Sequence, residues 1–135
     1  MKSIYLRNIN KLYSKNGNIH KFLQVKKNTK NISEIYFSEI KFLKIKCWKK
    51  HLLNNLRLHV IKGQIRFVVI SGNKKMYRFD LNELSDQYMY IPKKTIFGFQ
   101  GLKKKNVLLC SLEKSHNDKE VQNFSYDEFS NRYWK

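Results

Sequence analysis

The sequence has few cysteine, proline and glycine residues, which form disulfides or set sharp turns in the backbone, and it lacks alanine. Its 135 residues include two cysteines, one proline, five glycines and no alanine. Two cysteines, Cys47 and Cys110, provide no disulfide framework, and in a reducing compartment such residues are most often small buried apolar groups. The absence of alanine together with 14 asparagines is the bias expected of drift toward AT-rich codons.

Long apolar runs are also missing. The longest, such as residues 67–70 and 107–110, fall far short of the roughly 18 residues that a membrane-spanning helix requires. The N-terminal ten residues carry charge without a following apolar stretch and small-residue cleavage site, so no signal peptide is predicted. We therefore expect a soluble, cytoplasmic protein with no membrane partner.

Acidic residues are scarce, with 10 against 28 lysines and arginines, and the formal net charge is +18. Such a charge suggests an anionic partner: nucleic acid, an acidic lipid surface or a phosphorylated small molecule. Lysines outnumber arginines 23 to 5. This ratio does not favour nucleic-acid binding, because arginine is the residue that makes bidentate hydrogen bonds to phosphates and base edges. The lysines are also scattered in pairs and one triplet, so we predict a phosphorylated small molecule and no nucleic acid.

Alternating apolar residues, not helical spacing, dominate the chain. Short β-type runs occur at residues 35–38, 41–48, 56–62, 64–70, 76–81, 88–91, 96–99 and 107–112, separated by polar turns. Gly63 between two of these runs predicts a tight hairpin. So many short strands indicate an all-β sandwich or barrel in a single domain over residues 1–135, with a short helical or irregular C-terminal segment.

Several segments together resemble the family of dTDP-4-dehydro-6-deoxysugar 3,5-epimerases and their relatives in bacterial surface-polysaccharide clusters. In chain order they are Gly17-Asn18-Ile19-His20, Glu34-Ile35-Tyr36-Phe37-Ser38, Ile45 to His51, Val60 to Val68, Tyr90-Ile91-Pro92, Asp127-Glu128 and Tyr133-Trp134. The resemblance covers about residues 15–134 and implies a cupin, or jelly-roll, β-barrel. Strand alternation would then place Ile45, Cys47, Lys49 and His51 on the cavity face, with Trp48 and Lys50 outside.

Metal binding is not expected from these residues. The positions that carry metal ligands in many cupins correspond here to Lys49, His51, Leu56 and Phe97. One imidazole beside a lysine and two apolar groups cannot supply the three or four ligands that a transition metal needs. We predict no metal and no other cofactor.

The resemblance also implies a mechanism. Family epimerases use a histidine to remove the proton beside the C4 ketone, a lysine to stabilise the enolate and a tyrosine to return a proton. These three positions correspond here to Lys49, Leu56 and a position close to Cys110, while His51 matches a second histidine of related keto-isomerases. The predicted catalytic residues are therefore His51 as base and Lys49 as cation.

Each candidate has a structural alternative. His51 could instead be a core histidine, and Tyr90 could offer its hydroxyl to the cavity or fill the core. Arg66 could bind a diphosphate or face water. The predicted substrate-binding residues are Arg66, Tyr90 and Cys110.

Two functions from different classes remain open at this stage. The first is a nucleotide-sugar epimerase or isomerase that acts on a 4-keto-6-deoxy sugar by metal-independent proton transfer in surface-polysaccharide biosynthesis. The second is a catalytically silent cupin that binds a nucleotide sugar or a partner biosynthetic enzyme. A homodimer is expected in either case, because Tyr36, Phe37 and an outward-facing Trp48 would otherwise expose aromatic surface.

Overall fold

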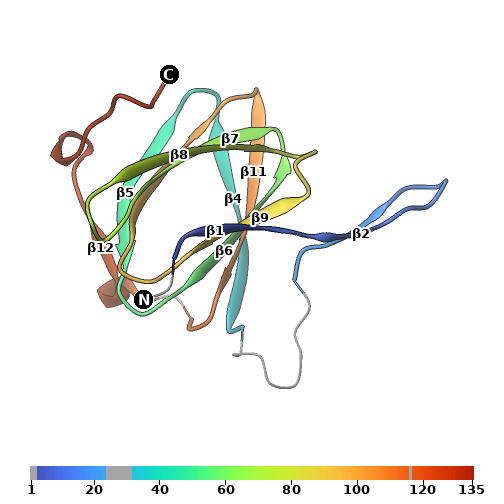
Figure 1. Ribbon diagram of the computed structural model, residues 1–135, viewed down its shortest axis with the longest axis horizontal. Helices are drawn as coiled ribbons and strands as arrows, with labels where there is room; N and C mark the ends of the chain where they lie inside the picture. Colours follow the sequence, from blue (N-terminus) through green and yellow to red (C-terminus); the bar gives the residue numbers. More distant parts are fainter. Residues whose placement is uncertain (1–2, 24–31, 116) are drawn as a thin grey trace.

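The computed structural model describes residues 3–23, 32–115 and 117–135. Two antiparallel five-stranded sheets make up its body (Figure 1). The first sheet has the order β1 (Tyr5–Asn8), β9 (Gln87–Ile91), β6 (Leu56–Lys62), β11 (Lys105–Leu112) and β4 (Glu34–Lys41). The second has the order β12 (Val121–Asn123), β5 (Ile45–His51), β10 (Ile96–Gly101), β7 (Gln64–Ile70) and β8 (Met76–Asn82).

The remaining elements are short. Strands β2 (Asn10–Leu12) and β3 (Ile19–Lys21) form a separate hairpin that projects away from the sheets in Figure 1. Two 3₁₀ turns, η1 (Asp118–Glu120) and η2 (Tyr126–Glu128), lie in the C-terminal segment. The all-β jelly-roll fold and the short, irregular C-terminal segment are as predicted, in the form of a sandwich and not a closed barrel. No helix within the described ranges is long and apolar enough to cross a membrane.

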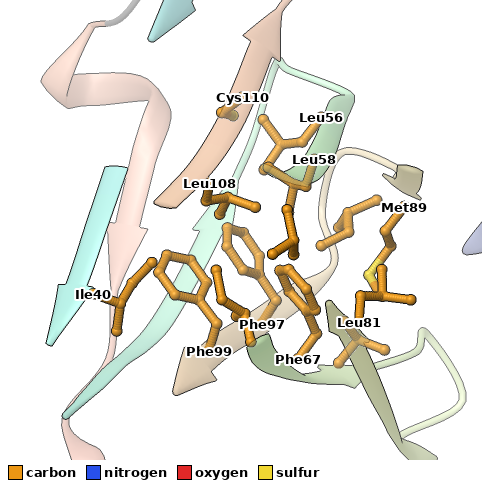
Figure 2. Packing of buried hydrophobic residues seen from close by; sticks show 14 of the residues in the cluster. Ile40, Leu56, Leu58, Phe67, Leu81, Met89, Phe97, Phe99, Leu108 and Cys110 are labelled. Atoms are coloured by element: carbon orange, nitrogen blue, oxygen red, sulfur yellow. The ribbon is translucent and has the colours of Figure 1, made fainter. Parts of the chain in front are cut away.

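The main core fills the space between the sheets. Figure 2 shows Phe67, Phe97 and Phe99 of the second sheet facing Leu58 and Leu108 of the first. Burying a side chain of this size contributes about 1.5–3 kcal/mol relative to leaving it in water. Because alternate residues of a strand point to the same side, each core residue identifies the inner face of the strand that carries it.

A second apolar cluster covers the outer face of the second sheet. Trp48, Val68 and Ile70 form its centre, and the C-terminal tail, residues 124–135, packs over them. Trp48 donates its indole N–H to the carbonyl oxygen of Tyr126 at 3.2 Å and is 0% exposed. The outward direction expected for Trp48 is correct, but the expectation that it exposes aromatic surface is wrong, because the tail covers it.

The predicted hairpin around Gly63 is also wrong. Strands β6 and β7 lie in different sheets, so the chain crosses at Gly63 from one sheet to the other. Gly63 has a φ of +78°, and a side chain there would collide with the carbonyl oxygen of Lys105. A tight turn between two apolar runs has the same local sequence whether it joins paired strands or two packed sheets.

Candidate active site

Strand β5 presents Lys49 and His51 on its inner face. Lys49 pairs with Phe97, a core residue, and paired residues of antiparallel strands point to the same side. The His51 ring stacks on Phe97 with ring centroids 5.9 Å apart. His51 is buried, whereas the Lys49 side chain is exposed. The face expected for Lys49 and His51 is therefore the one observed.

A β-bulge changes the face of the residues that precede them. Cys47 and Trp48 together oppose the single residue Gly98 of β10, and a side chain on Gly98 would collide with Cys47. The extra residue shifts the alternation by one position. Cys47 consequently packs in the outer cluster and Lys46 points inward opposite Phe99, so the predicted inward face of Ile45 and Cys47 is wrong.

His51 is held by a buried carboxylate. Its Nδ1 lies 2.8 Å from Oε2 of Glu120, which η1 brings against the end of β5. The other carboxylate oxygen of Glu120 accepts the backbone N–H groups of Leu53 and Asn54, each at 3.0 Å. Burial alone would raise the pKa of Glu120, but the hydrogen bonds from Leu53 and His51 outweigh it, and the pKa lies below its ordinary value.

This pairing fixes the roles of the two imidazole nitrogens. An ionised carboxylate only accepts hydrogen bonds, so Nδ1 of His51 carries the proton and donates it to Glu120. Nε2 is left with a lone pair, and within the described ranges no hydrogen bond engages it. His51 is therefore arranged as a proton acceptor whose protonated form would be stabilised by Glu120.

Tyr36 of β4 points inward from the first sheet, toward the side on which β5 presents His51. It pairs with Cys110 of β11 and its side chain shares a hydrogen bond with that thiol. Burial first, and then Cys110, raise the pKa of Tyr36 well above its ordinary value. Burial likewise raises the pKa of Cys110 to about 12. Near neutral pH Tyr36 is thus a proton donor, and Cys110 is a protonated thiol and not a nucleophile.

Two lysines complete the group. Lys46 donates from Nζ to Oγ of Ser38, two residues along β4 from Tyr36, at 3.1 Å. Burial, followed by the charge of Lys49, lowers the pKa of Lys46. We call the group of Tyr36, Ser38, Lys46, Lys49, His51, Cys110 and Glu120 the β4–β5 site. It combines a proton acceptor, a proton donor and two cations.

Arg66 lies outside this site. Its guanidinium makes two hydrogen bonds to the carboxylate of Asp80, at 2.8 and 2.9 Å, and a third to the carbonyl oxygen of Tyr133 at 2.7 Å. It shares the outer face of β7 with Val68, under the C-terminal tail. Arg66 is buried, so the alternative in which it faces water is wrong, and Asp80 and Tyr133 already occupy its guanidinium.

Tyr90 also lies elsewhere. Its neighbours Met89 and Ile91 point into the main core, so Tyr90 points to the outer face of the first sheet. There its ring stacks on Tyr5 with centroids 4.6 Å apart, and the guanidinium of Arg57 lies 5.3 Å from its centroid. Of the predicted substrate-binding residues, only Cys110 lies on an inner face, in the main core, and the position expected for Tyr90 at the cavity is wrong.

Sequence reasoning missed Glu120 and the inward role of Tyr36. The alternation of residues 34–40 does contain the signal for Tyr36, because Ile40 is a core residue and Tyr36 is four positions earlier on the same face. Glu120 gives no such signal, since 69 positions separate it from His51. Among the described residues, no group of three or more histidines, cysteines and acids is arranged to hold a metal ion.

Comparisons with known proteins agree with this fold. No protein-family model matches the sequence, and no curated protein matches it significantly. Solved structures do match. A dTDP sugar isomerase from Desulfovibrio desulfuricans superposes with a TM-score of 0.84 at 20% identity, covering 94% of this chain and 87% of that one.

Two further structures match almost as well. A dTDP-4-dehydrorhamnose 3,5-epimerase from Bacillus anthracis, with TDP and pyrophosphate bound, gives a TM-score of 0.81 at 12% identity over 92% of this chain and 79% of that one. A histidine-to-asparagine mutant of a 3,4-ketoisomerase from Thermoanaerobacterium thermosaccharolyticum, in complex with TDP-4-keto-6-deoxyglucose, gives 0.79 at 13% identity over 90% and 88%. The chain therefore has the jelly-roll fold of the dTDP-sugar epimerases and isomerases, the fold that its sequence resemblance implied.

Proposed function

We propose that this protein is an epimerase or isomerase of a nucleotide-linked 4-keto-6-deoxy sugar. The observation that carries the proposal is the buried pair of His51 and Glu120, which leaves Nε2 of His51 as a proton acceptor. Lys46 and Lys49 lie on the same inner face of β5, and Tyr36 of β4 interacts with the charge of Glu120. Solved structures of the same fold are dTDP-sugar epimerases and isomerases. The net charge of +18 also suits an anionic nucleotide diphosphate.

The proposed reaction is a proton transfer next to a ketone. Nε2 of His51 takes the proton from the carbon beside the carbonyl group, and the electron pair of that C–H bond moves to form an enolate. Lys49 or Lys46 stabilises the enolate oxygen, and Glu120 stabilises the imidazolium. Return of a proton from Tyr36 to the same carbon completes a change of configuration. For a change of carbonyl position the proton goes to the former carbonyl carbon, and the proton of the neighbouring hydroxyl group passes to the enolate oxygen. Proton exchange with solvent then restores His51 and Tyr36.

A silent binding module is the second candidate. The family positions for lysine and tyrosine correspond here to Leu56 and to a position close to Cys110, and Leu56 and Cys110 are each 1% exposed in the main core. The apolar side chain of Leu56 cannot stabilise an enolate oxygen as the family lysine does. In this case the protein would not turn over a substrate. The two lysines would hold a nucleotide sugar, or else a partner biosynthetic enzyme would cover the site.

We further propose that the protein acts in the cytoplasm, in bacterial surface-polysaccharide biosynthesis, as a homodimer. The outer face of the first sheet supports the dimer, because Ile35 and Phe37 are 58% and 67% exposed on adjacent outward positions of β4. Light scattering at micromolar concentration should give the mass of two chains. A single-chain mass for the wild type would contradict the dimer.

The test of the activity is isotope exchange in heavy water. Wild-type protein is incubated with a panel of dTDP- and UDP-linked 4-keto sugars, and deuterium incorporation at carbons beside the ketone is followed by NMR. An active enzyme incorporates deuterium into at least one sugar and converts it to a new isomer. Saturable binding without incorporation would favour the silent module.

A further inference from the structure

Two cavities lie on either side of the turn between β7 and β8, away from the β4–β5 site. The first, of about 840 Å³, is bounded by this turn and by the C-terminal tail. The second, of about 830 Å³, opens between the turn and the start of β1. Both are lined by Ser71, Gly72, Tyr77 and Lys94, and both have the size of ordinary small-molecule sites.

The first cavity gathers uncompensated positive charge. Lys74, Lys75, Lys94 and Arg132 line it, with Glu128 as the acidic residue. The carboxylate of Glu128 already accepts the backbone N–H of Ser125 at 3.1 Å. Within the described ranges none of the four cations forms an ion pair. Four exposed cations around one concave surface give it a positive potential that favours an anionic ligand.

The walls of this cavity are fixed by contacts on both sides. The tail is held by the hydrogen bond from Arg66 to Tyr133 and by two hydrogen bonds between Gln100 and Lys135, of 2.9 and 3.1 Å. On the opposite side, the backbone N–H of Lys94 donates to the carbonyl oxygen of His51 at 2.6 Å. Such walls exist before any ligand arrives, which lowers the cost of ordering a site on binding.

Apolar side chains form the inner part of the cavity. Ile70, Met76, Ile96 and Phe129 line it and belong to the outer apolar cluster around Trp48. A ligand that suits these surroundings has an anionic group for the rim and an aromatic or aliphatic group for the interior. We propose that the cavity between the β7–β8 turn and the tail is a second binding site, for a small organic phosphate ester.

This site is independent of the proposed activity at His51. The lysine and arginine side chains bind the phosphate oxygens by charge-assisted hydrogen bonds, and the ester group packs against Ile70 and Phe129. No residue of β5 lines either cavity, so a ligand there would leave Nε2 of His51 accessible. The second cavity shares Tyr77 and Lys94 and gives a larger ester room to extend.

The experiment is an NMR titration of the full chain with two probes, phenyl phosphate and inorganic phosphate. We expect phenyl phosphate to bind more tightly, with shifts of backbone amides centred on residues 71–77, 94 and 128–132. The triple variant K74Q/K75Q/R132Q should weaken phenyl phosphate binding by about tenfold or more. A matched variant, K103Q/K104Q/K105Q, removes the same charge from exposed lysines at the turn into β11 and at its first residue and should retain wild-type affinity.

Three outcomes would overturn the proposal. Equal weakening in both triple variants would indicate attraction by the net charge alone. Shifts confined to the β4–β5 site would place the ligand there instead. Equal affinity for inorganic and phenyl phosphate would show that the apolar wall is not used. None of these outcomes depends on whether the protein turns over a nucleotide sugar.

Discussion

Two of the histidines that the structure describes are buried, and they differ in the group that each one hydrogen-bonds. His51 and His59 are each 6% exposed, and each stacks on a phenylalanine, Phe97 and Phe22 respectively. His51 lies on the inner face of the second sheet and donates to the carboxylate of Glu120. His59 lies on the outer face of the first sheet and bonds to the backbone carbonyl of Gln87 at 2.9 Å.

The difference shows how burial and partner together set the chemistry of a histidine. A carboxylate stabilises a positive imidazole, so His51 can take up a proton during a reaction without losing its position. Burial lowers the pKa of His59, and the carbonyl of Gln87 only partly offsets it. His59 is therefore kept neutral as a structural group, although exposure alone would not distinguish it from His51.

Removing the carboxylate that binds His51 should lower both the stability and the rate of isotope exchange, and this is the largest effect that we expect. Glu120→Ala leaves the N–H groups of Leu53 and Asn54 without acceptors and the buried His51 without an anion, which should lower the free energy of unfolding by about 3 kcal/mol. Isotope exchange should fall with it. The matched change near His59, Gln87→Ala, keeps the backbone carbonyl and should cost under about 1 kcal/mol. Urea unfolding of both variants checks this, and equal losses would contradict the importance assigned to the Glu120 carboxylate.

Tyr36→Phe should affect rate more than stability. It deletes the proton donor of the β4–β5 site while keeping the ring, so isotope exchange should slow by about 100-fold. Tyr90→Phe is the matched control, since Tyr90 is a buried tyrosine on the far side of the first sheet. Exchange kinetics of the two variants should differ, and unchanged kinetics in the Tyr36 variant would remove Tyr36 from the mechanism.

The pH dependence of stability should separate the two histidine regions. Because the pKa of His59 is lowered on folding, the unfolded chain binds a proton that the folded chain does not. Stability should therefore fall as pH drops below the ordinary histidine value of about 6.5, by up to about 1.4 kcal/mol per pH unit. Unfolding curves from pH 7 to pH 5 should show this slope, and His59→Asn should flatten it.

Glu120 should act in a lower pH window. Its pKa is lowered on folding, so its contribution is present above the ordinary carboxyl value and is lost as pH falls through the lowered one. The same unfolding curves, extended below about pH 4.5, should lose stability in the wild type. A wild-type curve that is flat in both windows would contradict both assignments.

Lys49→Gln should give the smallest change in the rate of isotope exchange. Lys49 is exposed, and Lys46 provides a second cation on the same face, so exchange should slow by about tenfold or less. Lys50→Gln is the matched control, because Lys50 points to the opposite face, where its ammonium lies 5.6 Å from the centroid of the Phe124 ring. Equal effects of the two changes would indicate a general electrostatic contribution and no specific contact.

Much of the fold could be predicted because strand alternation is a local pattern. Residues 56–62 and 64–70 form strands as expected, and the inward direction of His51 follows from alternation after Trp48. The bulge at Cys47 and Trp48 could not be predicted, since an extra residue in one strand is visible only against its partner, here Gly98.

The candidate site was predicted only in part for the same reason. Lys49 and His51 lie on one strand, and their spacing alone gives them a common face. The partner of His51 comes from a 3₁₀ turn 69 residues later, and no local signal links the two. Arg66 was misplaced because its partners, Asp80 and the backbone of Tyr133, are also set by the tertiary fold.

The most direct measurement compares two single substitutions in one assay. Deuterium incorporation from heavy water into a 4-keto sugar nucleotide is measured for wild type, His51→Asn and His59→Asn, with folding checked by circular dichroism. We predict that His51→Asn slows incorporation by about 100- to 10,000-fold while His59→Asn stays near the wild-type rate. Incorporation at the wild-type rate by a folded His51→Asn protein would contradict the role of His51 as the base.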